Sequence, residues 1–303
     1  MNDEQLKPLS FNNNDDIKPI SFGDKNESDR NDFVHIDDAD TKEIGEKDTN
    51  YVLLFGSPYS GKSVILTSIL YFLNAKAGNL KTNIKSINSN EAQVLIATFL
   101  ENISQGVLPE RTQVDKVTEI DFTFIPNNKS KKVPPINLTF LETAGDNNNQ
   151  IKKGGKFHSS IENYFSSNVP LTILMVTSYD NAHKEDAFIL EFINKIEEYG
   201  NLQNVKILLV ISKWDLSGKI NVSHESELNR FIQQKLPMTY SALNTYKMDK
   251  TFFTIGHVEN QKITKLSLER AKRISNWIYQ NITGKPLDYE GTFWERIKFS
   301  INN

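Results

Sequence analysis

Residues 51–63 read Tyr51-Val52-Leu53-Leu54-Phe55-Gly56-Ser57-Pro58-Tyr59-Ser60-Gly61-Lys62-Ser63, an apolar run that passes into a turn with two glycines. The apolar part has the length of a buried strand, and residues 63–73 place apolar side chains at helical spacing. The turn between them fits the pattern G-x-x-x-x-G-K-[ST] at a strand-to-helix junction. This order of strand, turn and helix is the first indication of an α/β fold.

The turn contains the groups that a phosphate-binding loop needs. Glycines let the backbone approach phosphate oxygens, and successive N–H groups at a helix N-terminus stabilise negative charge. The pattern places Lys62 on the β- and γ-phosphates, where it assists catalysis, and the Ser63 hydroxyl on Mg²⁺. A glycine-containing surface turn is the alternative. We expect the whole loop to bind nucleotide, namely Gly56, Ser57, Pro58, Tyr59, Ser60, Gly61, Lys62 and Ser63.

Beyond this loop, strand-like and helix-like patterns alternate. The alternation predicts three layers, a mostly parallel central sheet with helices on both faces. Alternating apolar residues at 120–124 and 136–140 predict a hairpin, and continuous apolar runs at 171–176 and 205–212 predict central strands. We expect a last strand at 251–255 and helices at 63–73, 91–104, 185–199, 225–236 and 264–282.

Composition separates the domain from its tails. Residues 1–50 hold fourteen Asp and Glu against six Lys and Arg, whereas the rest of the chain holds 24 acidic and 29 basic residues. This acidic segment has few apolar residues, and we expect disorder there. It contains two copies of K-P-[LI]-S-F, at residues 7–11 and 18–22, which are a docking peptide or a coincidence of biased composition. We expect the folded domain at 51–285 and a short helical tail at 286–303.

Several functional classes are disfavoured. The absence of cysteine excludes disulfides and thiolate metal sites. The basic residues form no stripe that would favour nucleic acid. No apolar run is long enough for a transmembrane segment, and we expect a cytoplasmic protein.

A second motif ends the strand predicted at 136–141, with the sequence Leu141-Glu142-Thr143-Ala144-Gly145-Asp146. In P-loop nucleotide hydrolases, an acid at such a strand end binds Mg²⁺ through water, and a glycine N–H that follows can sense the γ-phosphate. We therefore expect Glu142 on the metal side and Gly145 at the γ-phosphate. The alternative is an ordinary acidic residue at the end of a strand.

A third motif, Ser212-Lys213-Trp214-Asp215, follows the central strand at 205–212. A carboxylate such as Asp215 can accept two hydrogen bonds from the N1–H and N2–H₂ edge of guanine, and adenine has no such pair of donors. Lys213 is expected along the base plane. The alternative is a tetrapeptide that closes a strand and caps the next helix.

Together the three motifs resemble those of the P-loop GTPases, in the class that includes translation factors and Ras-like proteins, over about residues 50–283. The family pattern D-x-x-G appears here as Glu142-Thr143-Ala144-Gly145, and [NT]-K-x-D as Ser212-Lys213-Trp214-Asp215. The resemblance implies a G domain that binds GTP and GDP with Mg²⁺. It also implies GTP hydrolysis and a switch that acts on a protein partner.

The resemblance also suggests further site residues. Thr112 is placed as the second Mg²⁺-binding hydroxyl, and the tripeptide Thr254-Ile255-Gly256 as the loop over the base, with Ile255 and Gly256 in contact with it. Ser241-Ala242-Leu243 has similar letters, but no apolar strand precedes it. Arg111 is an internal arginine finger or an ordinary solvated arginine. Asp146 stands where Ras-like proteins have the glutamine that orients the attacking water, and we assign it to the catalytic set.

A second similarity, carried by the L-P-x-R-T loop at 108–112 and the T-I-G tripeptide, is to bacterial paired-GTPase families of conflict systems. Partner contacts are expected at the switch loops, the helix at 91–104 and the N-terminal repeats. Two rival functions remain open. One is an ATPase or small-molecule kinase with the same phosphate loop, and the other is a scaffold that binds GTP without hydrolysing it.

Overall fold

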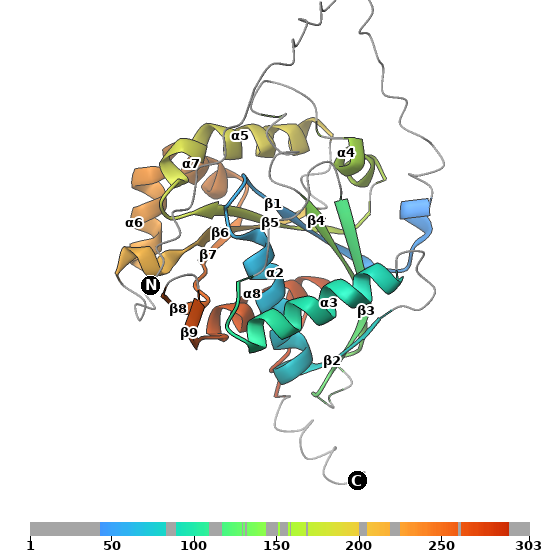
Figure 1. The fold of residues 1–303 in the computed structure, drawn as a ribbon. Coiled ribbons are helices and arrows are strands. Elements are labelled where there is room, and N and C mark those ends of the chain that lie inside the picture. Colours follow the sequence, from blue (N-terminus) through green and yellow to red (C-terminus); the bar gives the residue numbers. More distant parts are fainter. Residues whose placement is uncertain are drawn as a thin grey trace, which may run out of the picture. The chain divides into compact units, whose positions relative to one another are not determined.

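The computed structural model describes residues 43–82, 89–108, 117–128, 130, 132–143, 151, 157, 159–167, 169–199, 205–218, 225–259 and 262–290, all of which belong to the compact unit Ile36–Asn303. Their main element is a seven-stranded sheet in the order β2-β3-β4-β1-β5-β6-β7 (Figure 1). Neighbours from β4 to β7 pair in parallel, whereas β3 is antiparallel to both β2 and β4. The strands are β1 Asn50–Phe55, β2 Gly78–Thr82, β3 Val117–Pro126, β4 Ile136–Thr143, β5 Leu171–Ser178, β6 Val205–Ser212 and β7 Asp249–Phe252. The predicted α/β fold with a mostly parallel sheet is confirmed.

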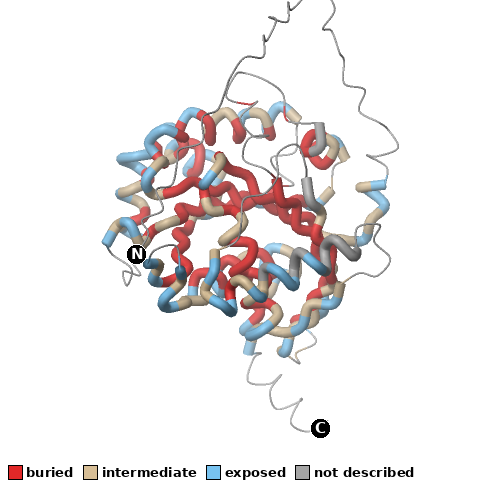
Figure 2. The backbone as a smooth tube through the Cα atoms, viewed as in Figure 1, coloured by how far each residue is buried: buried red, intermediate tan, exposed pale blue. Residues whose placement is uncertain are grey.

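Helices cover both faces of this sheet. Along β1, Val52 and Leu54 belong to one buried cluster with α2 and α8, whereas Leu53 and Phe55 belong to a second cluster with α4, α5, α6 and α7. Figure 2 shows the buried residues running along the sheet and the inner sides of the helices. The helices are α2 Lys62–Phe72, α3 Ser89–Ser104, α4 Ser159–Ser166, α5 Ala182–Glu198, α6 Glu225–Lys235, α7 Pro237–Thr245 and α8 Glu269–Thr283. Two apolar faces on each central strand explain the continuous apolar runs in the sequence.

The strand order determines where the motif loops emerge. β1 lies between β4 and β5, and β6 lies beside β5. The helix after β1 packs on one face of the sheet, and the helices after β4, β5 and β6 pack on the other. Loops after parallel strands leave at the same edge of the sheet, and a change of face between neighbouring strands opens a crevice there. The C-terminal ends of β1, β4 and β6 therefore share one edge.

One predicted helix begins too early. Lys262–Leu266 forms β9, which pairs antiparallel with β8, Gly256–Glu259, and α8 starts only at Glu269. Ile263 N–H donates to the carbonyl of Gly106 (2.8 Å), so long-range pairing overrides the helical spacing. The strand predicted at 251–255 ends at Phe252. The sequence Ser241-Ala242-Leu243 lies in α7 and ends no strand.

Both expected domain boundaries differ from the contacts in the structure. Residues 43–50, assigned to the acidic tail, include Lys47, whose ammonium group contacts β3. At the other end, Leu287 is buried and its carbonyl accepts a hydrogen bond from Asn128 (2.9 Å). The K-P-[LI]-S-F repeats and residues 291–303 lie outside the described residues. Among the helices that the structure describes, none has the length and apolarity to cross a membrane.

Candidate functional site

The 56–63 loop connects β1 to α2 and depends on two glycines. A Cβ atom on Gly56 would lie 2.2 Å from the carbonyl oxygen of Val176, at the neighbouring strand β5. Gly61 has φ +91°, a left-handed conformation that other residues adopt only with strain. The glycines that the sequence pattern singles out are thus required by close approach and by backbone conformation.

Lys62 lies inside this loop. Its side chain is buried, and its Nζ atom donates to the carbonyls of Gly56 (2.9 Å) and Ser57 (3.1 Å). Buried ammonium groups are costly without acceptors, and here loop carbonyls supply them. The positive charge is therefore held at the start of α2, where the helix dipole also favours an anion.

Ser63 and Glu142 meet at the adjoining strand end. The Ser63 hydroxyl donates to Glu142 Oε1 at 2.5 Å, and Glu142 is only 2% exposed. Glu142 lies opposite Leu54 in the β1–β4 ladder, so the first two motifs are neighbours. Hydroxyl and carboxylate oxygens are ligands suited to Mg²⁺, which usually takes few protein ligands and completes its shell with water and phosphate. Among the described residues, no group of three or more His, Cys, Asp or Glu could hold a metal ion. Ser63 and Glu142 are therefore candidates only for an Mg²⁺ site whose other ligands are water and phosphate.

The third motif touches the first through Ser212. Its hydroxyl donates to the carbonyl of Ser60 at 2.5 Å, which joins the end of β6 to the 56–63 loop. A Cβ atom on Gly61 would lie 3.3 Å from the same hydroxyl. The motifs at the ends of β1, β4 and β6 are thereby brought into one site.

Asp215 lies beside the tripeptide Thr254-Ile255-Gly256. The Thr254 hydroxyl is 3.5 Å from Asp215 Oδ1, and it accepts a hydrogen bond from the Gly256 N–H (3.2 Å). The backbone N–H of Trp214 also donates to the carbonyl of Phe253 (3.1 Å). Lys213 adopts φ +51° and its Nζ is 3.4 Å from Asp180. The two segments predicted to surround a base are therefore adjacent.

Packed aromatic rings support the segments predicted to surround a base. The Trp214 ring stacks on Phe252 (centroids 4.8 Å apart), and the Arg270 guanidinium lies 3.6 Å from the centre of the Phe252 ring. Burial lowers the pKa of Arg270, and the stacking partly compensates for this desolvation. The sequence places Ser212 and Thr254 in motifs but does not predict their contacts. Arg270 lies in none of the motifs, and no sequence signal points to it.

Three expected site residues are not located. Thr112, Gly145 and Asp146 lie outside the described residues, as does Arg111. The groups that would contact a γ-phosphate and orient a water molecule therefore stay predictions.

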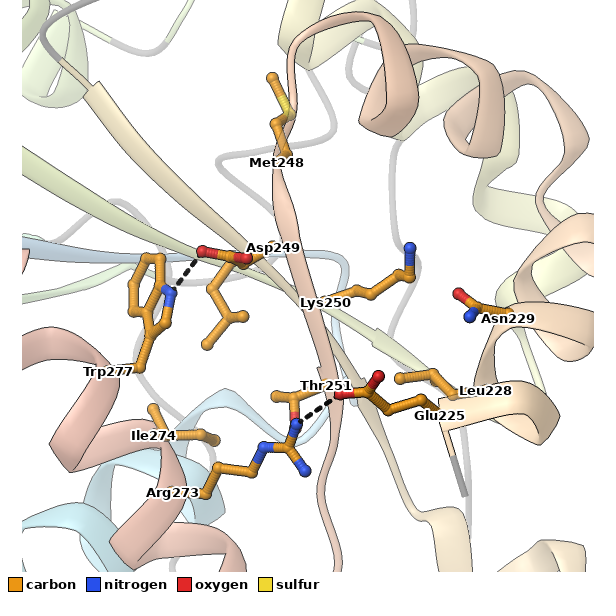
Figure 3. A pocket seen from close by; sticks show the side chains of 11 residues that line it. Glu225, Leu228, Asn229, Met248, Asp249, Lys250, Thr251, Arg273, Ile274 and Trp277 are labelled. Atoms are coloured by element: carbon orange, nitrogen blue, oxygen red, sulfur yellow. Dashed lines mark hydrogen bonds and ion pairs between the residues drawn. The ribbon is translucent and has the colours of Figure 1, made fainter. Parts of the chain in front are cut away.

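A cavity of about 280 Å³ lies elsewhere, between α6, β7 and α8 (Figure 3). Its acids are engaged by neighbouring side chains. Asp249 accepts a hydrogen bond from the Trp277 indole (2.7 Å), and Glu225 is 3.4 Å from Arg273. None of the motif residues lines this cavity, so it is separate from the candidate site.

Comparison with known proteins adds no assignment. No family model matches the chain, and no curated protein matches it at a significant level.

Proposed function

We propose that the chain binds guanine nucleotide with Mg²⁺ and hydrolyses GTP, and that it acts as a nucleotide-dependent switch on a protein partner. The observation that carries the proposal is the meeting of three motif loops. Ser63 contacts Glu142, Ser212 contacts Ser60, and Thr254 lies beside Asp215. One triphosphate nucleotide spans a phosphate loop, a metal side and a base pocket, and the three contacts join residues predicted for these three parts.

The phosphate half of the site would use the 56–63 loop. Its N–H groups and the Lys62 ammonium group carry the positive potential for the β- and γ-phosphates. Ser63 and Glu142 would hold Mg²⁺, the serine directly and the glutamate through water, with Thr112 as the second hydroxyl. The Mg²⁺ ion neutralises developing charge on the phosphates when it is bound.

The base half would use Asp215. Its carboxylate matches the two donors on the guanine edge, and the 3.5 Å contact with Thr254 restrains its position. Lys213, Ile255 and Gly256 would border the ring. Adenine would leave this carboxylate without the pair of donors that guanine offers, which is the physical basis for discrimination.

Hydrolysis would proceed with Gly145 at the γ-phosphate and Asp146 near the attacking water. Asp146 replaces the glutamine of Ras-like proteins, so we expect slow turnover without an activating protein. Loss of the γ-phosphate would release the loops that contact it and change a partner surface.

The test is a titration of the full chain with fluorescent GTP and ATP analogues. Lys62→Ala should abolish the binding of both. Asp215→Asn should weaken GTP at least about tenfold and raise the affinity for xanthosine triphosphate, because the amide now offers a donor where guanine also has one. Asp288→Asn, an exposed acid on the last described segment, is the matched control.

Three outcomes separate the rivals. ATP binding as tight as GTP binding favours the ATPase or kinase. Tight GTP binding without phosphate release, even with the partner supplied, favours the scaffold. An Asp215→Asn variant with unchanged base preference removes the guanine assignment.

A further inference from the structure

A partly buried charge cluster lies on β3, away from the motif loops. Lys47 Nζ is 2.8 Å from a carboxylate oxygen of Glu119 and 2.8 Å from one of Asp121. Lys47 precedes β1, whereas both acids lie on one face of β3, two residues apart. Asp121 is only 4% exposed, so this interaction is not a surface ion pair. We call these three residues the clasp.

Hydrogen bonds extend the clasp to two more elements. The Thr139 hydroxyl on β4 donates to Asp121 at 2.5 Å, and it is 2.9 Å from the Thr49 hydroxyl. The Tyr164 hydroxyl on α4 donates to Glu119. The segment 44–50, β3, β4 and α4 are therefore linked through one set of polar side chains.

The two carboxylates of the clasp stabilise the charged form of Lys47. Burial by itself lowers the pKa of Lys47, but the hydrogen bonds and charges of Asp121 and Glu119 outweigh it and raise this pKa above its usual value. Removal of one partner from such a pair leaves an uncompensated charge in a poorly hydrated place. Loss of Lys47 therefore leaves two neighbouring carboxylates that repel each other on the face of the sheet.

The same strands connect the clasp to the metal side of the candidate site. Asp121 lies opposite Thr139 on β4, and Thr118 lies opposite Glu142. β1 continues the ladder, since Tyr51 lies opposite Thr139 and Leu54 opposite Glu142. Thr139 and Glu142 are three residues apart, about 10 Å along the strand. Thr139, which contacts the clasp, and Glu142, which contacts Ser63, therefore lie on one short stretch of β4.

We propose that the clasp positions the end of β4, and that displacement of residues 44–50 from β3 weakens Mg²⁺-dependent nucleotide binding. Lys47 is then a positioning residue that acts on Glu142 through the β3–β4–β1 ladder. The nucleotide part rests on the proposed function, whereas the positioning of β4 does not. Nucleotide binding could be regulated in this way, because a process that displaces residues 44–50 from β3 would also shift Glu142 on the metal side of the site.

The first test is hydrogen exchange of the full chain without nucleotide, for Lys47→Met, Lys47→Arg and Lys206→Met. Lys47→Met should accelerate exchange of peptides covering residues 136–143 about fivefold relative to peptides covering α5, residues 182–198. Lys47→Arg should restore most of the protection, because it keeps the charge. Lys206 is an exposed lysine on β6, and its replacement controls for the lost charge.

A purely stabilising role predicts a different pattern. Loss of global stability accelerates both peptides equally, and that result, or an unchanged 136–143 peptide, overturns the proposal. If Lys47→Met does not fold, Glu119→Gln provides the same comparison, since it removes one charge but retains Asp121. A selective effect in Glu119→Gln supports the positioning role.

The second test measures nucleotide binding as a function of Mg²⁺. Lys47→Met should raise the Mg²⁺ concentration for half-maximal binding of a fluorescent GTP analogue about fivefold, and leave the binding in chelator unchanged. An equal loss with and without Mg²⁺ overturns the link to Glu142. If Lys47→Met shows the selective exchange effect but the wild type binds no guanine nucleotide, the proposed function fails while the positioning of β4 stands.

Discussion

At the scale of single residues, Ser212 connects the third motif to the 56–63 loop. Its hydroxyl reaches back to the carbonyl of Ser60, so one short side chain holds the end of β6 against the 56–63 loop. Both residues are buried, so loss of this donor would leave the Ser60 carbonyl in a poorly hydrated place. An unsatisfied buried carbonyl costs more than an average hydrogen bond contributes.

Ser212→Ala should therefore weaken nucleotide binding by about 1 kcal/mol, or about fivefold. The control is Ser104→Ala, because the Ser104 hydroxyl also donates to a backbone carbonyl but is exposed at the end of α3. Equilibrium titration measures the affinity, and thermal unfolding reports any loss of stability. Equal affinities in the two variants would show that the bond to Ser60 does not organise the site.

The sequence predicted which residues belong to the motifs but not which of them touch. Gly56, Gly61 and Lys62 are recognisable from their spacing, since the pattern itself encodes a tight backbone turn. The contacts of Ser212 with Ser60 and of Thr254 with Asp215 join residues more than thirty positions apart. Such pairs depend on strand order, which local periodicity does not specify.

At the scale of elements, the hydrogen bond from Tyr164 on α4 to the clasp makes the stability of the fold depend on alkaline pH. Burial, the Glu119 charge and the hydrogen bond to Glu119 all raise the pKa of Tyr164 far above the usual tyrosine value of about 10. The folded tyrosine thus stays neutral at pH values where the unfolded tyrosine ionises. Its contribution to stability is complete below about pH 10 and is lost as the pH rises from there toward the folded pKa.

Tyr164→Phe should therefore flatten the fall of unfolding free energy between about pH 9 and pH 11, because the variant has one ionisable group fewer in the unfolded chain. Urea unfolding at several pH values gives this slope for both proteins. Tyr240→Phe, on α7, is the matched control, because no hydrogen bond of its hydroxyl is part of the clasp. Identical slopes in wild type and Tyr164→Phe would contradict the assignment.

Elements with strong periodicity were predictable, and those that depend on pairing were not. The hairpin of β3 and β4 and the central strands β5 and β6 were predicted, because their apolar patterns reflect burial on one or two faces. β2 is a short edge strand, Gly78–Thr82, whose partner β3 lies some forty residues further along the chain. The sequence predicts a helix that begins within β9, because five residues carry too little periodicity to separate a strand from a helix.

At the scale of the whole molecule, the start of the folded domain depends on the contacts of Lys47, which the acidic composition of the N-terminal segment does not indicate. Residues 43–50 share the acidic character of the N-terminal segment, and Lys47 gains its significance only from Glu119 and Asp121, more than seventy residues away. An ion pair of this kind has no local signature in the sequence.

Two truncations test this boundary. Removal of residues 1–42 should leave the melting temperature and nucleotide affinity unchanged, because this acidic segment has few apolar residues that could join a core. Removal of residues 1–49 deletes Lys47 and Thr49 and should lower the melting temperature by several degrees, since a loss of about 1 to 2 kcal/mol shifts a domain of this size by roughly 2 to 4 °C per kcal/mol. Equal melting temperatures for the two truncated chains would argue against a folded segment ahead of β1.

The ion pair between Arg273 and Glu225 joins α8 to α6 beside the outermost strand, β7 (Figure 3). An open strand edge can recruit a strand from another molecule, and side chains bridging across it obstruct such recruitment. Because both partners are largely exposed, concentrated salt weakens the bridge. High ionic strength is therefore expected to leave the β7 edge less obstructed.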